Sequence, residues 1–272
     1  MTITEQITRA KTDLDRAYEA GKAEGIGQGG VDVSHLNDEL EQILYGTDTG
    51  GKSFYDEFWD KYQDNGVPKT YMYAFAGYGW TDELFKPKYD IYMNNSSNIY
   101  VFQYSRITDI AESLRRCGVV LNTSRATSLV GLFVYAATET IPVIDASNST
   151  SMAYLCQECK NLKTFEKLIL STKSNANYTS AFSRCTSLEN LTLEGTLSQN
   201  GFDLKDCTKL SKASIYSVIN ALSSTTSGLT VTLSQTAVDD AFYDEVPDEV
   251  GSQSTEWLNL VDTKPNWTIS LA

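Results

Sequence analysis

The chain has 272 residues, and 41% of them are hydrophobic, which is enough to form the core of one large domain or of several small modules. Its formal net charge of -13 disfavours a nucleic-acid partner, because phosphate binding draws on concentrated lysine and arginine. No apolar run is long enough to cross a bilayer, and residues 1–11 lack the apolar core of a secretory signal. We therefore expect neither insertion into a membrane nor export by the usual signal.

The N-terminal segment has the spacing of an amphipathic helix. Apolar residues alternate at steps of three and four over residues 3–21, which also leaves self-association through this helix open. The glycine-rich run 25–30 ends the helix, and it lacks the Lys-Ser/Thr end of a phosphate loop. Ser34 is a typical N-cap for a second helix. We therefore predict that residues 1–48 are a helical segment for attachment or oligomerisation.

Aromatic residues are concentrated in the next segment, over residues 54–92. One interpretation is a platform that binds sugars. A buried core is favoured over it, because aromatic side chains most often bury their area inside the protein. We predict that residues 49–95 form an aromatic-rich N-terminal cap.

A repeated pattern occupies residues 126–212, where a Ser or Thr cluster precedes a short turn ending in Phe-x-x-Cys or a variant. The closing residues 136, 159, 185 and 207 are separated by 23, 26 and 22 positions. A period in the low twenties is typical of a solenoid with one short strand per coil, because each coil buries its apolar face only against its neighbours. The predicted repeat core consists of Phe133, Cys156, Cys159, Leu162, Phe182, Cys185, Leu188, Cys207 and Leu210.

Strands are expected after successive units, at residues 140–144, 164–170 and 190–193, and residues 99–121 look like one or two degenerate coils. Beyond the repeat, the spacing predicts a helix at 215–222 and strands at 229–233 and 267–271. The expected fold class is α+β: a short leucine-rich-repeat-like β-solenoid over residues 96–212, with N-terminal helices and an α/β C-terminal cap over residues 213–272.

Residues 181–193, Ala-Phe-Ser-Arg-Cys-Thr-Ser-Leu-Glu-Asn-Leu-Thr-Leu, and 159–165, Cys-Lys-Asn-Leu-Lys-Thr-Phe, resemble the BspA-like class of leucine-rich repeats, whose units read F-x-x-C-x-x-L before a strand. The resemblance covers residues 96–212, although Ala136 stands where the first clear unit would have Cys. Parts of residues 55–90 and 210–233 are similar to minor structural proteins, associated with the tail or baseplate, of phages and prophages of gut Firmicutes.

These resemblances imply a non-enzymatic phage virion structural protein, associated with the tail and involved in host-surface recognition or adhesion. The implied partners are a host-surface glycan or protein, or neighbouring virion proteins, with a homo-oligomer possible through the N-terminal helix. The implied location is the virion. An alternative is a bacterial cell-surface adhesin or interaction module, and a third is a polysaccharide-degrading enzyme.

The sequence offers few candidates for chemistry. Cys156-Gln-Glu-Cys159 could be a redox pair or half a zinc site, but both cysteines align with interior repeat positions, and no second CxxC or histidine pair completes a metal site. His35 is the single histidine and follows the N-cap at a solvated position. We therefore predict no catalytic residue, no cofactor and no metal.

Acidic pairs near the C-terminal end are the remaining candidates. Glycoside hydrolysis needs two carboxylates across a cleft, but these pairs lie in an acidic stretch that contains Pro and Gly, which favours a solvated loop or a weak cation site. The pairs are Asp239 with Asp240, Asp244 with Glu245, and Asp248 with Glu249.

Overall fold

The computed structural model describes residues 63–64, 67–68, 75–78, 80–87, 90–93, 99–242 and 254–272. The chain divides into two compact units, Met1–Lys69 and Thr70–Ala272. In the first unit, the described residues form an antiparallel pair of strands, β1 (Gln63–Asp64) and β2 (Val67–Pro68). The helices predicted within residues 1–48, the glycine run 25–30 and His35 lie outside the described residues.

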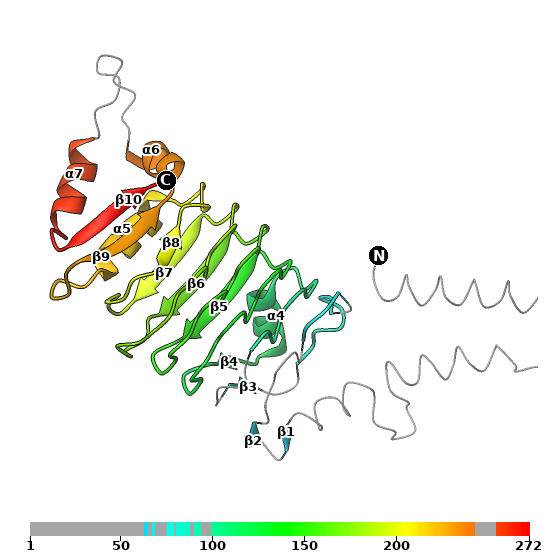
Figure 1. Cartoon of the computed structure of the whole chain (residues 1–272). Helices are drawn as coiled ribbons and strands as arrows, with labels where there is room; N and C mark the ends of the chain where they lie inside the picture. The colour runs from blue at the N-terminus through cyan, green and yellow to red at the C-terminus, as the bar shows by residue number, and fades with distance from the viewer. Residues whose placement is uncertain are drawn as a thin grey trace, which may run out of the picture. The chain divides into compact units, whose positions relative to one another are not determined.

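The described part of the second unit combines three short parallel sheets with four helices (Figure 1). The sheets are β3 (Ile91–Tyr92) with β4 (Leu121–Asn122); β5 (Thr140–Asp145), β6 (Thr164–Ile169) and β7 (Asn190–Glu194); and β8 (Phe202–Leu204), β9 (Leu229–Leu233) and β10 (Trp267–Leu271). The helices are α4 (Ile110–Cys117), α5 (Lys212–Ala221), α6 (Gln235–Phe242) and α7 (Thr255–Asp262).

The central sheet, β5-β6-β7, pairs each repeat unit with the next one along the chain. Ile141, Phe165 and Leu191 are register partners, and all three side chains are buried. The turns between strands are also hydrogen-bonded from one unit to the next. Phe133 N–H donates to Leu155 C=O at 2.8 Å, and Cys156 N–H donates to Ala181 C=O at 2.7 Å in the following turn. The alternation of inward and outward side chains along each strand explains why these strands could be predicted.

The strand predictions at residues 140–144, 164–170 and 190–193 are confirmed as β5, β6 and β7 to within one residue at each end. The strands predicted at 229–233 and 267–271 are confirmed as β9 and β10. The helix predicted at 215–222 is confirmed as α5, which begins three residues earlier because the Ser211 side chain caps it.

The expected fold class, an α+β β-solenoid, is wrong. The described residues give a small mixed α/β arrangement of three short parallel sheets and four helices. Helix α4 packs against β5 and helix α5 packs against β7, and these are the two outer strands of the central sheet. Serine hydroxyls of α5 accept from backbone N–H groups of β7, at 2.8 Å for Leu191 with Ser214 and for Leu193 with Ser217. The predicted helix α5 therefore covers the outer side of β7, and its serine hydroxyls bond the backbone there.

The degenerate coils expected over residues 99–121 are also replaced in part by helix α4. Asp109 caps this helix, since its Oδ1 accepts from Glu112 N–H at 2.8 Å, and Gly118 ends it with a φ of 68°. Aspartate at the N-cap and glycine just after the last turn are common helix boundaries. These two residues are a local signal for a helix, whereas the apolar spacing by itself suggests a coil.

Stacked phenylalanines form the core of the unit's first half. The ring of Phe102 lies 5.0 Å from Phe75 and 5.3 Å from Phe133, measured between ring centroids, and all three rings are fully buried. Phe75 and Phe85, from the aromatic-rich segment, belong to this core, whereas Tyr78 is 62% exposed. The aromatic residues of that segment up to Tyr73 lie outside the described residues. In the described part of the chain, no helix combines the length and the apolar character that a membrane crossing requires.

Candidate functional site

The nine residues of the predicted repeat core are all buried, with exposed fractions between 0% and 3%. Three of the cysteines make the same contact, because each thiol donates to a carbonyl of the preceding unit. Cys159 Sγ bonds Phe133 C=O at 2.8 Å, Cys185 Sγ bonds Cys156 C=O at 3.0 Å, and Cys207 Sγ bonds Phe182 C=O at 3.6 Å. Cys156, Cys159, Cys185 and Cys207 are free thiols in this interior.

The environment of these thiols disfavours the thiolate form. Burial raises the pKa of Cys156, Cys185 and Cys207, and the neighbouring thiols add to the shift for the first two. The thiolate is the nucleophile and the metal ligand, so these positions are poorly suited to either role. Within the described ranges, no group of three or more His, Cys, Asp or Glu side chains could hold a metal ion.

An unusual backbone conformation recurs in the turns of the repeat units. Seven residues other than glycine have φ between 54° and 62°: Tyr100, Tyr104, Tyr135, Tyr154, Glu158, Ser180 and Arg184. They occupy two positions, four residues apart, in successive units, and four of the seven are tyrosines. The left-handed conformation costs a residue with a Cβ roughly 1–2 kcal/mol, and glycine avoids that cost. Bulky side chains at such positions therefore suggest a role outside folding.

Three tyrosines form a contiguous row beside these turns, which we call the tyrosine row: the exposed Tyr78 and Tyr135, with the half-buried Tyr104 between them. The ring of Tyr104 lies 5.5 Å from Tyr78 and 4.7 Å from Tyr135, and the second pair is stacked at an interplanar angle of 12°. Tyr135 is 42% exposed. The guanidinium of Arg106 lies 5.3 Å from the centroid of the Tyr78 ring. Tyr104 and Tyr135 stack face to face, so this pair presents mainly ring edges and hydroxyl groups to a partner, whereas the Tyr78 ring is tilted by 42° against Tyr104.

The two units after Tyr135 place charged residues at the equivalent position, Glu158 and Arg184. The Arg184 guanidinium pairs with the Glu158 carboxylate, and the Lys160 ammonium lies 3.2 Å from the same carboxylate. The hydrogen bond from Arg184 lowers the pKa of the Glu158 carboxyl. Arg184 keeps 66% of its side chain exposed, whereas Glu158 keeps 7%. The row thus continues into an oriented guanidinium whose position is held by a carboxylate.

Sequence reasoning missed the tyrosine row. A signal was present, because Tyr135, Glu158 and Arg184 each come immediately before the closing residue of a repeat unit. Alignment of the units by their closing residues would have shown that this position is polar or aromatic in every unit. The ring contacts between units, however, depend on how the turns stack.

The acidic pairs are placed only in part. Asp239 and Asp240 lie in helix α6, so their interpretation as loop residues is wrong. The Asp239 carboxylate accepts a hydrogen bond from the Gln235 side chain at 2.6 Å, one helical turn earlier. Asp244, Glu245, Asp248 and Glu249 lie outside the described residues.

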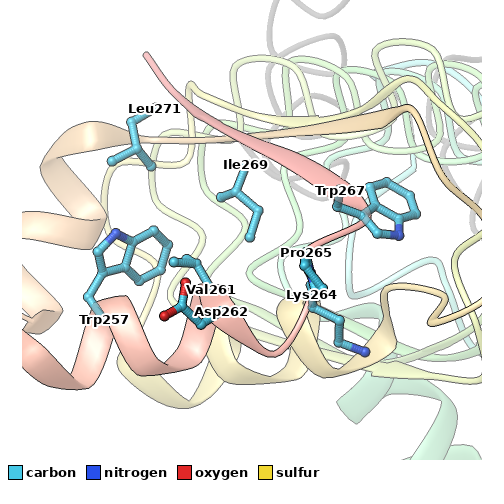
Figure 2. A pocket seen from close by; sticks show the side chains of 8 residues that line it. All are labelled: Trp257, Val261, Asp262, Lys264, Pro265, Trp267, Ile269 and Leu271. Atoms are coloured by element: carbon cyan, nitrogen blue, oxygen red, sulfur yellow. The ribbon is translucent and has the colours of Figure 1, made fainter.

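A cleft of about 320 Å³ lies between α7 and β10 (Figure 2). Its apolar walls include Trp257 and Val261 from the helix and Ile269 and Leu271 from the strand. The Trp267 indole N–H donates to Ser223 C=O at 2.9 Å, which holds that ring at the start of β10.

Two surface features of the described residues are therefore suited to binding, the tyrosine row and the cleft beside β10. Both consist of side chains held by packed elements, and neither brings a nucleophile together with a base in the contacts described above. No family model matches the chain, and comparisons with characterised proteins and with solved structures found no match.

Proposed function

We propose that the protein is a non-enzymatic recognition protein whose tyrosine row binds a host-surface glycan or protein, as a tail-associated structural component of a phage virion. The observation that carries the proposal is the row itself. Tyr104 and Tyr135 stack on left-handed backbone, Tyr78 and Tyr135 are exposed, and the Glu158–Arg184 ion pair continues the row. The virion context is supported by the sequence resemblance to tail and baseplate proteins.

Tyrosine is suited to such a surface for two physical reasons. Its ring supplies a large contact area with only two side-chain torsions to restrict, so the entropic cost of binding is small. Its hydroxyl donates and accepts hydrogen bonds, which suits glycan hydroxyls and peptide groups alike. In the row, the stacking of Tyr104 on Tyr135 restricts these torsions before a partner arrives.

The binding proposal is tested with fluorescently labelled protein on intact host bacteria and on their isolated wall polysaccharide. We expect the double variant Tyr104→Ser, Tyr135→Asn to bind about tenfold more weakly or worse, because truncation of a central interface tyrosine commonly costs more than about 1 kcal/mol. The matched control is Val143→Thr, which changes an exposed apolar residue of β5 and should bind like the wild type. Equal binding by the double variant would contradict the proposal.

The virion context is tested separately by immunogold labelling of purified phage particles. Label on the tail supports the proposal, and label only on the surface of uninfected bacteria would favour the adhesin alternative. Incubation of the protein with the same wall polysaccharide checks the non-enzymatic assignment. New reducing ends that are lost in Asp239→Asn would overturn it.

A further inference from the structure

The last strand of the C-terminal sheet has one edge that no described residue pairs with. The order of this sheet is β10-β9-β8, so β9 is central and β10 is an outer strand. Ala272 N–H donates to Leu233 C=O, and Gln235 N–H donates to Ala272 C=O, at 3.1 and 3.0 Å. The backbone N–H and C=O groups of the even-numbered residues of β10 therefore point toward β9. Those of the odd-numbered residues point away from it.

The outward-facing groups are the N–H and C=O of Ile269 and Leu271. Neither residue bonds any described residue through the outer edge of β10. Natural proteins protect such edges with Lys, with Pro, with a bulge or with a covering segment. The five residues of β10 include no Lys or Pro, and their register with β9 has no shift. Lys264, just before the strand, points its ammonium to Asn220 C=O and Leu222 C=O instead, at 3.1 and 2.5 Å.

The same two residues, Ile269 and Leu271, also line the cleft. The side chains of Ile269 and Leu271 form its floor on the strand side, and Trp257 and Val261 of α7 form the opposite wall (Figure 2). A groove between a helix and an open strand edge offers a partner two kinds of contact together: backbone hydrogen bonds along the edge and an apolar site for alternate side chains.

Charge selects the chemistry of the partner. In the described parts of residues 213–272 the acidic residues are Asp239, Asp240, Glu256 and Asp262, and the one basic residue is Lys264, which lines the cleft and whose ammonium bonds the two carbonyls named above. Asp262 is exposed at the cleft wall. A cationic side chain next to the apolar ones would therefore be attracted to this site.

We propose that the edge of β10 binds an extended, basic peptide segment of another protein as an added strand, with alternate apolar side chains in the cleft beside α7. A small molecule would use the cleft but would leave the N–H and C=O groups of Ile269 and Leu271 bonded only to water. The extended peptide uses both, and this decides between the two occupants. The site is separate from the tyrosine row, so the two proposals stand or fall independently.

The test uses the full-length protein and a fluorescent peptide of sequence Lys-Val-Thr-Val-Lys-Val-Thr-Val-Lys, with binding followed by anisotropy. We expect a dissociation constant below about 1 mM. The same peptide N-methylated on every valine and threonine should bind at least about tenfold more weakly, because it cannot form the strand hydrogen bonds. This comparison leaves the protein unchanged, so it does not depend on whether a variant folds.

Two variants locate the site on the protein. Ile269→Pro removes an N–H that β9 does not use, and it should weaken peptide binding about tenfold or more while it preserves the fold. Asp262→Asn should weaken binding severalfold at low salt and less at high salt. Thr268→Ala, an exposed change on the same strand, is the matched control and should have no effect. Equal binding of the methylated and unmethylated peptides, equal binding by Ile269→Pro, or no binding of the peptide would each overturn the proposal.

Discussion

At the scale of single residues, Tyr135 shows how folding and binding can compete for one position. Its φ of 57° lies in the left-handed region, which glycine and asparagine adopt at lower energetic cost than a residue with a bulky side chain. The ring recovers part of the cost by stacking on Tyr104, a contact worth about 0.5–1.5 kcal/mol beyond its buried area. The stacking energy therefore offsets most of the backbone strain, and the exposed ring is available to the partner proposed above.

Two substitutions separate the cost of the backbone strain from the gain of the ring stacking. Tyr135→Asn relieves the strain and loses the stacking, so its free energy of unfolding should stay within about 1 kcal/mol of the wild type. Tyr135→Val also loses the stacking, but a β-branched side chain fits the left-handed conformation worst, so we expect it to be at least about 1 kcal/mol less stable than Tyr135→Asn. Urea unfolding measures both. Equal stabilities would show that this turn does not keep its positive φ in solution.

At the scale of elements, helix α5 determines where the central sheet ends. The Ser214 hydroxyl accepts from Leu191 N–H at 2.8 Å and donates to Glu189 C=O at 2.8 Å. The hydroxyl thereby satisfies backbone groups of β7 that a neighbouring strand would otherwise bond. This arrangement lets a helix lie where backbone pairing would have continued, and it divides the sheets.

Ser214→Ala tests this role. The change leaves the buried Leu191 N–H without a partner, so the free energy of unfolding should fall by about 1–3 kcal/mol. Ser224→Ala is the matched control, because Ser224 is exposed, and it should stay within about 0.5 kcal/mol of the wild type. Chemical denaturation of the two variants measures the difference. If both variants had the stability of the wild type, a water molecule would have to replace the hydroxyl, and α5 would not be the element that ends the sheet.

At the scale of the whole molecule, the buried thiols link stability to alkaline pH. Burial raises the pKa of Cys156, Cys185 and Cys207 from the ordinary value of 9.0, and it raises the pKa of Tyr178 to about 12. Above about pH 9 the unfolded chain releases these thiol protons while the folded protein keeps them. The unfolded state then binds fewer protons, so stability falls as the pH rises. Below the ordinary thiol pKa the folded and the unfolded states are both protonated, so the contribution of the buried thiols to folding stability is fully present.

We therefore expect the free energy of unfolding to be insensitive to these thiols between pH 7 and 8.5 and to fall between pH 9 and 11. Each fully buried thiol contributes a slope of up to about 1.4 kcal/mol per pH unit there. Cys207→Ala should have a shallower slope over that range, whatever its stability at neutral pH. Urea titrations at a series of pH values measure both slopes. Identical slopes for the two proteins would contradict a protonated, buried Cys207.

The residues alone predicted the features that depend on local spacing. The alternation of apolar residues located β5, β6, β7, β9 and β10, and the repeat period indicated which residues share an interior position, because both patterns follow from the geometry of a strand and of a repeated turn. The caps of α4, Asp109 and Gly118, are also local signals, and the prediction of degenerate coils over residues 99–121 did not use them.

Tertiary structure alone decided the fold class and the candidate sites. The spacing of apolar residues predicted helix α5, but its place beside β7 depends on the Ser214 and Ser217 hydroxyls, which bond backbone groups more than twenty residues earlier in the chain. The stacking of Tyr104 on Tyr135 and the open edge of β10 likewise depend on which segments meet in space. Such contacts are not encoded in the spacing of neighbouring residues, and for that reason the sequence predicted the strands of this protein but not the surfaces that they build.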